Sequence, residues 1–103
     1  MILSAHSLPP RTGRGVRIAV VDSGIHAAHP HVGGISGGVG IGPLGELSDD
    51  YVDRLGHGTA VAAAIREKAP KCELLSVRVF DRTLTTTGLA LVAAIEWAAL
   101  QGV

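Results

Sequence analysis

The chain has 103 residues, 47% of them hydrophobic, and nine basic and nine acidic side chains give it a formal net charge of zero. This length suits one small domain, and the neutral charge lacks the basic footprint that binds nucleic acid or an acidic membrane surface. We therefore expect no nucleic-acid partner and no membrane partner.

Prolines and glycines set the first 15 residues apart from the rest of the chain. Pro9-Pro10, Gly13 and Gly15 interrupt them, so we expect an N-terminal arm at residues 1–15 and a domain at residues 16–103. The arm has no sustained apolar run, so we expect neither a signal peptide nor a transmembrane segment. The single Cys72 excludes an intrachain disulfide and fits a reducing compartment. Together these features predict a cytoplasmic protein, or a piece cut from a longer one.

Residues 16–21 form a short run rich in valine and isoleucine that ends on Asp22. Such side chains suit a strand, and the nearly continuous apolar run predicts a central strand covered on both faces of a parallel sheet. In open α/β sheets, ligands and reacting groups bind at the carboxyl ends of the strands, which is where Asp22 lies. Because a buried, unpaired carboxylate is costly, we expect a cation or a proton donor beside Asp22.

Three histidines follow Asp22 within a short loop: His26, His29 and His31. Imidazoles this close in sequence leave open a small His-rich metal-binding protein, although we expect His26 and His31 to be exposed and predict no metal site. Further along, Gly34-Ile35-Ser36-Gly37-Gly38 matches the G-x-S-x-G nucleophile pattern. We interpret this match as chance, since the glycine that follows cannot begin a stable helix.

The middle of the chain predicts an irregular strand around Val39 and Ile41, followed by an acidic segment at residues 46–53. We interpret the acidic segment as a solvated loop, with a cation site as the alternative. His57 then lies between Gly56 and Gly58, at the start of an alanine-rich run typical of a helix. We expect this helix to run from Thr59, near its cap, to Lys68.

His57 is the best candidate for the partner of Asp22. A carboxylate that accepts the Nδ1 proton of a histidine fixes its tautomer and leaves Nε2 free to act as a general base. Asp22 and His57 are therefore the candidate catalytic residues, two members of a Ser-His-Asp triad.

The last third of the chain predicts a buried strand at residues 74–80, a loop at 81–87 and a helix at 88–100. We expect Arg78 to be a structural pairing partner. The final helix is apolar on almost every side, with Glu96 as an exception, and so requires cover on several sides.

Taken in order, several short segments resemble the first half of a subtilisin-like serine peptidase. They are Val20-Val21-Asp22-Ser23-Gly24-Ile25, His29-Pro30, Gly56-His57-Gly58-Thr59, Val61-Ala62, Ala69-Pro70 and Leu75-Ser76-Val77-Arg78-Val79-Phe80. The resemblance implies an α/β three-layer sandwich with a mainly parallel sheet, here incomplete, and hydrolysis of peptide bonds in a peptide or protein substrate. It also implies that Asp22 is the triad aspartate and His57 the triad base, with no cofactor.

The chain also departs from the family pattern. Residues 65–70 are too few for the extra, often calcium-binding, loop of secreted members, so that site is not carried over. No segment resembles the family's Gly-Thr-Ser-Met-Ala nucleophile motif or supplies its oxyanion asparagine. Because losing the serine lowers the rate by a factor on the order of a million, we expect the chain alone to be inactive.

Two further hypotheses stay open beside a peptidase component whose serine comes from a downstream segment or a complementary chain. In the first of these hypotheses, the chain is a non-catalytic binding or assembly module on the same scaffold. In the second, it is the metal-binding protein considered above. In each case an incomplete sheet exposes an edge strand and apolar helix faces, so we expect a homo-oligomer.

Overall fold

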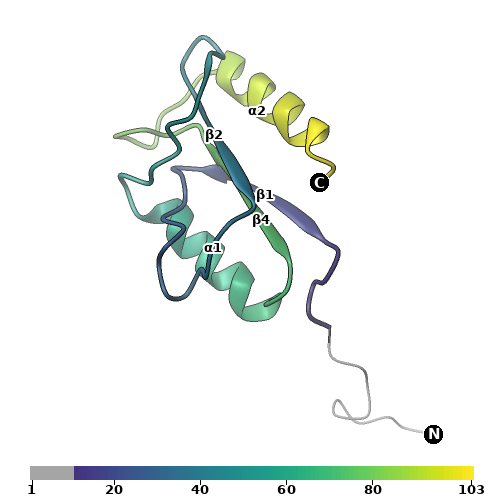
Figure 1. Ribbon diagram of the computed structural model, residues 1–103. Helices are drawn as coiled ribbons and strands as arrows, with labels where there is room; N and C mark the ends of the chain where they lie inside the picture. The colour runs from purple at the N-terminus through teal and green to yellow at the C-terminus, as the bar shows by residue number, and fades with distance from the viewer. Residues whose placement is uncertain (1–10) are drawn as a thin grey trace, which may run out of the picture.

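Residues 11–103 are described by the computed structural model, so residues 1–10 of the expected arm lie outside the described residues. The elements follow the order β1 (Arg17–Asp22), β2 (Gly37–Ile41), β3 (Leu47–Ser48), α1 (His57–Lys68), β4 (Glu73–Arg78) and α2 (Gly88–Leu100). One sheet lies between the two helices (Figure 1). The three-layer α/β sandwich expected from the sequence is confirmed.

The sheet has the strand order β1-β4-β2-β3. β4 pairs in parallel with β1 and with β2, whereas β3 is antiparallel to β2, so the sheet is mainly parallel. The prediction that β1 is a central strand is wrong, because in the described sheet it pairs with β4 alone. Val16 and Val21 accordingly keep 49% and 37% of their surface exposed. β4 lies between β1 and β2, and its Leu74 and Val77 are completely buried.

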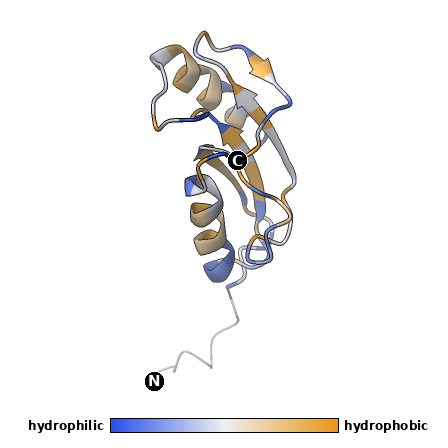
Figure 2. Cartoon of the chain, turned by 90° about the vertical axis from the view of Figure 1, so that its left-hand side faces the viewer, coloured by the Kyte–Doolittle hydropathy of each residue, from blue (hydrophilic) through white to orange (hydrophobic). Residues whose placement is uncertain are grey.

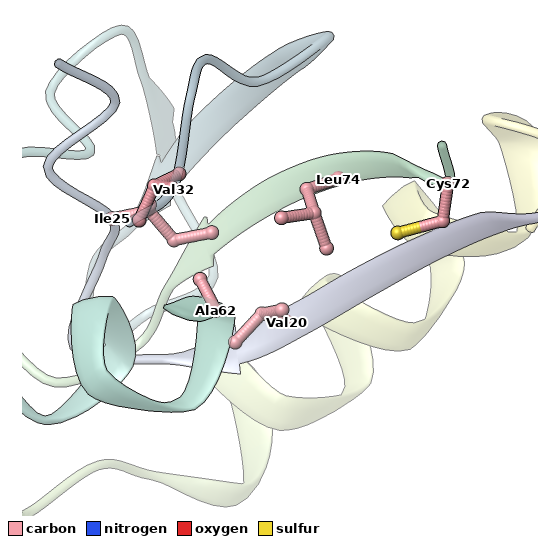
Figure 3. Packing of buried hydrophobic residues seen from close by; sticks show 6 residues of the cluster. All are labelled: Val20, Ile25, Val32, Ala62, Cys72 and Leu74. Atoms are coloured by element: carbon pink, nitrogen blue, oxygen red, sulfur yellow. The ribbon is translucent and has the colours of Figure 1, made fainter. Parts of the chain in front are cut away.

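Alternation along the strands divides the core into two clusters. Ile18, Val20 and Asp22 share the face that lies under α1, since every second side chain points to the same side. Figure 3 shows Val20 and Leu74 pointing toward Ala62 of α1. The buried members of this first cluster are Val20, Ile25, Val32, Ala62, Cys72 and Leu74. Cys72 therefore serves as a small buried hydrophobe.

The second cluster lies between the sheet and α2. Its buried members are Val39, Ile41, Val77, Val79, Ala90 and Ala94. α2 meets the sheet through its small side chains, and its larger ones remain outside: Leu89, Val92 and Ile95 are 60%, 55% and 68% exposed. In Figure 2 α2 is apolar or neutral in colour along nearly all its length, whereas α1 has hydrophilic ends. The all-round apolar character of this helix thus leaves a large face uncovered in residues 11–103.

The segment at residues 46–53 is more structured than the solvated loop expected from the sequence. Leu47 and Ser48 form the short strand β3 against β2, and Asp53 is partly buried against α1. The nucleophile-like Ser36 is exposed and is followed by strand β2 rather than by a helix, which agrees with a chance match. Within residues 11–103, neither helix has the length and apolar character needed to cross a membrane.

Arg78 has the pairing role expected of it. Its side chain is buried, its Nε donates to the backbone oxygen of Asp50 at 2.8 Å, and its Nη1 lies 3.7 Å from Asp81. These contacts hold the loops before α1 and after β4 against the carboxyl end of the sheet.

Candidate active site

Asp22 is fixed by the backbone around it at the carboxyl end of β1. Its carbonyl oxygen accepts hydrogen bonds from the backbone N–H groups of Val79 and Phe80 at 2.8 and 3.2 Å, which ties this strand end to the loop after β4. Its Oδ1 accepts from the N–H of Ser23 at 2.7 Å. Asp22 is 9% exposed, so its carboxylate is held in one place and largely removed from water.

His57 is the first residue of α1. The helix begins two residues earlier than the sequence predicted, and Gly56 precedes it with a left-handed backbone, φ 85°, which only glycine adopts without strain. This turn directs the imidazole toward β1. Nδ1 of His57 lies 2.9 Å from Oδ1 and 2.8 Å from Oδ2 of Asp22.

The pair has one buried side and one open side. The Asp22 side chain is 12% exposed, but the His57 side chain is 59% exposed. Among residues 11–103, the hydrogen bonds of the His57 ring all involve Nδ1. An Nδ1–H that donates to Asp22 leaves the lone pair of Nε2 free to accept a proton from an incoming group.

Two glycines allow the strand end and the helix start to come this close. A Cβ built on Gly58 would lie 2.0 Å from the backbone oxygen of Gly24, and one built on Gly24 would lie 2.5 Å from the backbone oxygen of Tyr51. Gly24 also has φ 105°. A side chain at Gly58 would therefore separate the backbones that carry Asp22 and His57, and one at Gly24 would push the turn after β1 away from residues 51–53.

The three histidines of the loop after β1 are not arranged as a metal centre. Nδ1 of His29 accepts a hydrogen bond from the backbone N–H of His31 at 3.1 Å, and the rings of His26 and His29 have centroids 6.5 Å apart. In the part of the chain that the structure describes, no three His, Cys, Asp or Glu side chains are placed to hold a metal ion. His26 and His31 are exposed, as expected.

Asp53 belongs to the site, and the sequence reasoning missed it. Its Oδ1 accepts from the Oγ of Ser23 at 2.8 Å and from the N–H of Gly56 at 2.8 Å. Its Oδ2 accepts from the N–H of Thr59 at 3.0 Å and from the Thr59 hydroxyl. Burial alone would raise the pKa of Asp53, but hydrogen bonds from Thr59, Ser23 and Gly56 outweigh it, and the pKa lies below its ordinary value. The N–H of Leu55, two residues later, also donates to Oδ1 of Asp53 at 3.0 Å, which makes an Asx turn. An aspartate followed by glycine three residues later is a typical turn pattern, the signal that could have identified it.

Comparison with known proteins identifies the family of this chain. The Subtilase family, a peptidase family, matches residues 13–103. Subtilisin E of Bacillus subtilis (strain 168) is 34% identical over 96 residues, covering 84% of this chain and 24% of that protein. Thermitase of Thermoactinomyces vulgaris is 34% identical over 108 residues, covering 87% of this chain and 35% of that protein.

A solved structure shows the same fold. The crystal structure of a cold-adapted subtilisin-like serine proteinase superimposes with a TM-score of 0.73 at 26% identity, covering 97% of this chain and 37% of that one. This likeness shows a subtilisin-like fold. The chain belongs to the subtilase family of serine peptidases, and it spans about a quarter to a third of the length of these two relatives.

Proposed function

We propose that this chain is the part of a subtilisin-like serine endopeptidase that contributes the aspartate and the histidine of a Ser-His-Asp triad. The observation that carries the proposal is the contact of His57 Nδ1 with both carboxylate oxygens of Asp22, at 2.9 and 2.8 Å. Family membership supports the same chemistry. The substrate class that follows is a peptide or protein.

In this proposal each residue has one task. Asp22 accepts the Nδ1 proton, which holds the imidazole in one tautomer and stabilises its protonated form. Nε2 of His57 removes the proton of a serine hydroxyl as that oxygen attacks the substrate carbonyl, and later returns it to the leaving amine. The 59% exposure of the His57 side chain leaves room for a serine and a substrate on that side.

The serine and the oxyanion asparagine have no counterpart among the 103 residues and come, in this proposal, from a downstream segment or a complementary chain. Until that part is present, the pair can orient and accept a proton but cannot form an acyl-enzyme. We therefore propose that residues 1–103 alone are inactive as a peptidase.

Reconstitution tests the proposal. The chain is co-expressed with the remainder of a relative, such as the part of thermitase that follows the segment similar to this chain, and a stable complex is isolated by gel filtration. The complex is then treated with a fluorophosphonate, which labels an activated serine. We expect labelling of the complex and none of the 103-residue chain.

Matched variants identify the base. His57→Ala removes the proposed general base and should abolish labelling of the isolated complex, whereas His31→Ala removes an exposed imidazole of the loop after β1 and should leave it unchanged. A complex that forms but stays unlabelled contradicts the proposed function. Equal labelling of the two variants contradicts the role of His57.

A further inference from the structure

The carboxylate of Asp53 is saturated with hydrogen bonds from two separate segments. From its own loop and the start of α1 it receives the N–H groups of Leu55, Gly56 and Thr59, at 3.0, 2.8 and 3.0 Å. It also receives the hydroxyls of Thr59 and of Ser23, the latter located directly after Asp22. A single carboxylate therefore joins the turn after β1 to the first turn of α1.

The direction of both hydroxyl hydrogen bonds is fixed by their surroundings. The Oγ of Ser23 accepts from the N–H of Gly58 at 2.9 Å, and the Oγ1 of Thr59 accepts from the N–H of His26 at 2.9 Å. A hydroxyl has one proton to donate, and in each case the acceptor within reach is an oxygen of Asp53. Position 53 thus needs an acceptor on both of its terminal atoms, which a carboxylate provides and a carboxamide does not.

The hydrogen bonds of Asp53 connect to residues next to each member of the catalytic pair, Ser23 beside Asp22 and Gly58 beside His57. Ser23 is completely buried and its N–H donates to the Oδ1 of Asp22 at 2.7 Å. Gly58, whose N–H donates to Ser23, directly follows His57 in the helix. Any lengthening of the Asp53 contacts moves these two neighbours, and with them the carboxylate and the imidazole.

We propose that Asp53 is a positioning residue, whose carboxylate sets the separation of Asp22 and His57 by holding the turn after β1 against the first turn of α1. Its side-chain hydrogen bonds reach neither member of the pair, and it acts through Ser23, Gly58 and Thr59. This inference rests on the proposed function for its catalytic meaning, but the geometry it concerns can be measured on the chain alone.

The test compares Asp53→Asn with Asp49→Asn, the same substitution at an exposed position of the same segment. Thermal unfolding reports stability, and the proton NMR resonance of the His57 Nδ1–H reports its hydrogen bond to Asp22. In folded Asp53→Asn we expect this resonance to shift or to be lost to exchange, and in Asp49→Asn to be unchanged. A purely structural role would lower stability and leave the resonance of the folded protein in place, which would overturn the proposal.

A milder pair of variants applies where Asp53→Asn does not fold. Thr59→Ala removes one hydroxyl donor to Asp53, and Thr59→Ser restores it. We expect the resonance to change in the alanine variant and to recover in the serine variant; an unchanged resonance in both contradicts the positioning role.

A second readout uses the reconstituted complex. There, Asp53→Asn should slow fluorophosphonate labelling by about 100-fold, the order expected when a reacting group is misplaced by about 1 Å. Asp49→Asn should label at the wild-type rate. A wild-type complex that stays unlabelled counts against the proposed function and leaves the NMR comparison as the measure of positioning.

Discussion

Asp22 and His57, 35 residues apart in the sequence, meet in one hydrogen-bonded pair in which Nδ1 lies within 2.9 Å of both carboxylate oxygens. The end of a strand supplies one partner and the first residue of a helix supplies the other. The same two backbones are also joined by the Asp53 contacts and by the close approach of Gly24 and Gly58. The pair is therefore a product of backbone packing, which makes it sensitive to changes that touch neither side chain.

Asp22→Asn should disable the pair while leaving the fold intact. A carboxamide at this position can present its nitrogen to Nδ1, which favours the wrong tautomer, and in serine peptidases this change lowers the rate by about 10⁴-fold. We expect a loss of this order in the rate of fluorophosphonate labelling of the reconstituted complex. Wild-type labelling by the variant would show that Asp22 does not orient His57.

Gly58→Ala should destabilise the protein although alanine is the better helix former. The new Cβ would lie 2.0 Å from the backbone oxygen of Gly24, so the backbones must move apart, and overpacking of this kind costs about 1–3 kcal/mol. Gly88→Ala is the control, because no atom lies within 4 Å of its Cβ and alanine there should stabilise α2 by up to about 1 kcal/mol. Urea unfolding measures both free energies. Equal effects of the two substitutions would contradict the close packing at Gly58.

Stability should fall in acid partly because of Asp53. Its pKa lies below the ordinary value of 3.8 in the folded protein, against the penalty of burial, because Thr59, Ser23 and Gly56 hydrogen-bond to its charged form. Its contribution to the free energy of unfolding is therefore present above pH 3.8 and is lost as the pH falls through the folded pKa.

Asp53→Asn removes this contribution, so its free energy of unfolding should depend less on pH over that range than that of the wild type. The dependence should be reduced rather than abolished, since Arg54 also lowers the pKa of Asp50. Denaturant titrations at a series of pH values give both curves. Asp49→Asn serves as the control, and parallel curves for Asp53→Asn and wild type would contradict the hydrogen bonding described at Asp53.

We also propose that the isolated chain self-associates through the uncovered face of α2. Val92 and Ile95 are 55% and 68% exposed, and contiguous apolar surface of this kind favours association. Light scattering should give a mass above the 10.5 kDa of one chain, and Ile95→Lys should shift it toward that value. Glu96→Lys, on the next residue of the same helix, should not. A wild-type chain that scatters as a monodisperse monomer would exclude this oligomer.

Local patterns were sufficient for much of the fold. The helix at residues 88–100 has the predicted bounds, and the strand around Val39 and Ile41 is present. The place of β1 in the sheet was not predictable in this way, because it depends on the pairing of β1 with β4. In that pairing Arg17 lies opposite Glu73, 56 residues later in the sequence. An apolar run indicates burial but does not say which strands flank it.

The site was predictable to the extent that its residues lie in recognisable segments. Asp22 and His57 were found because one ends an apolar strand and the other begins a helix between two glycines. Asp53 was missed because its acidic neighbours indicate a solvent-exposed loop. Its role depends on a hydrogen bond from the hydroxyl of Ser23, 30 residues away, and that bond forms only in the folded chain. Long-range hydrogen bonding of this kind leaves only a local Asx-turn signal in the sequence.

The tautomer of His57 is the most direct test of the central claim that Asp22 and His57 form a catalytic pair. Nitrogen-15 NMR of the chain labelled at histidine, recorded at a pH where the ring is neutral, identifies which nitrogen carries the proton. The structure predicts a proton on Nδ1 in the wild type and its redistribution toward Nε2 in Asp22→Asn. A wild-type ring protonated at Nε2, unchanged by that substitution, would contradict the pairing.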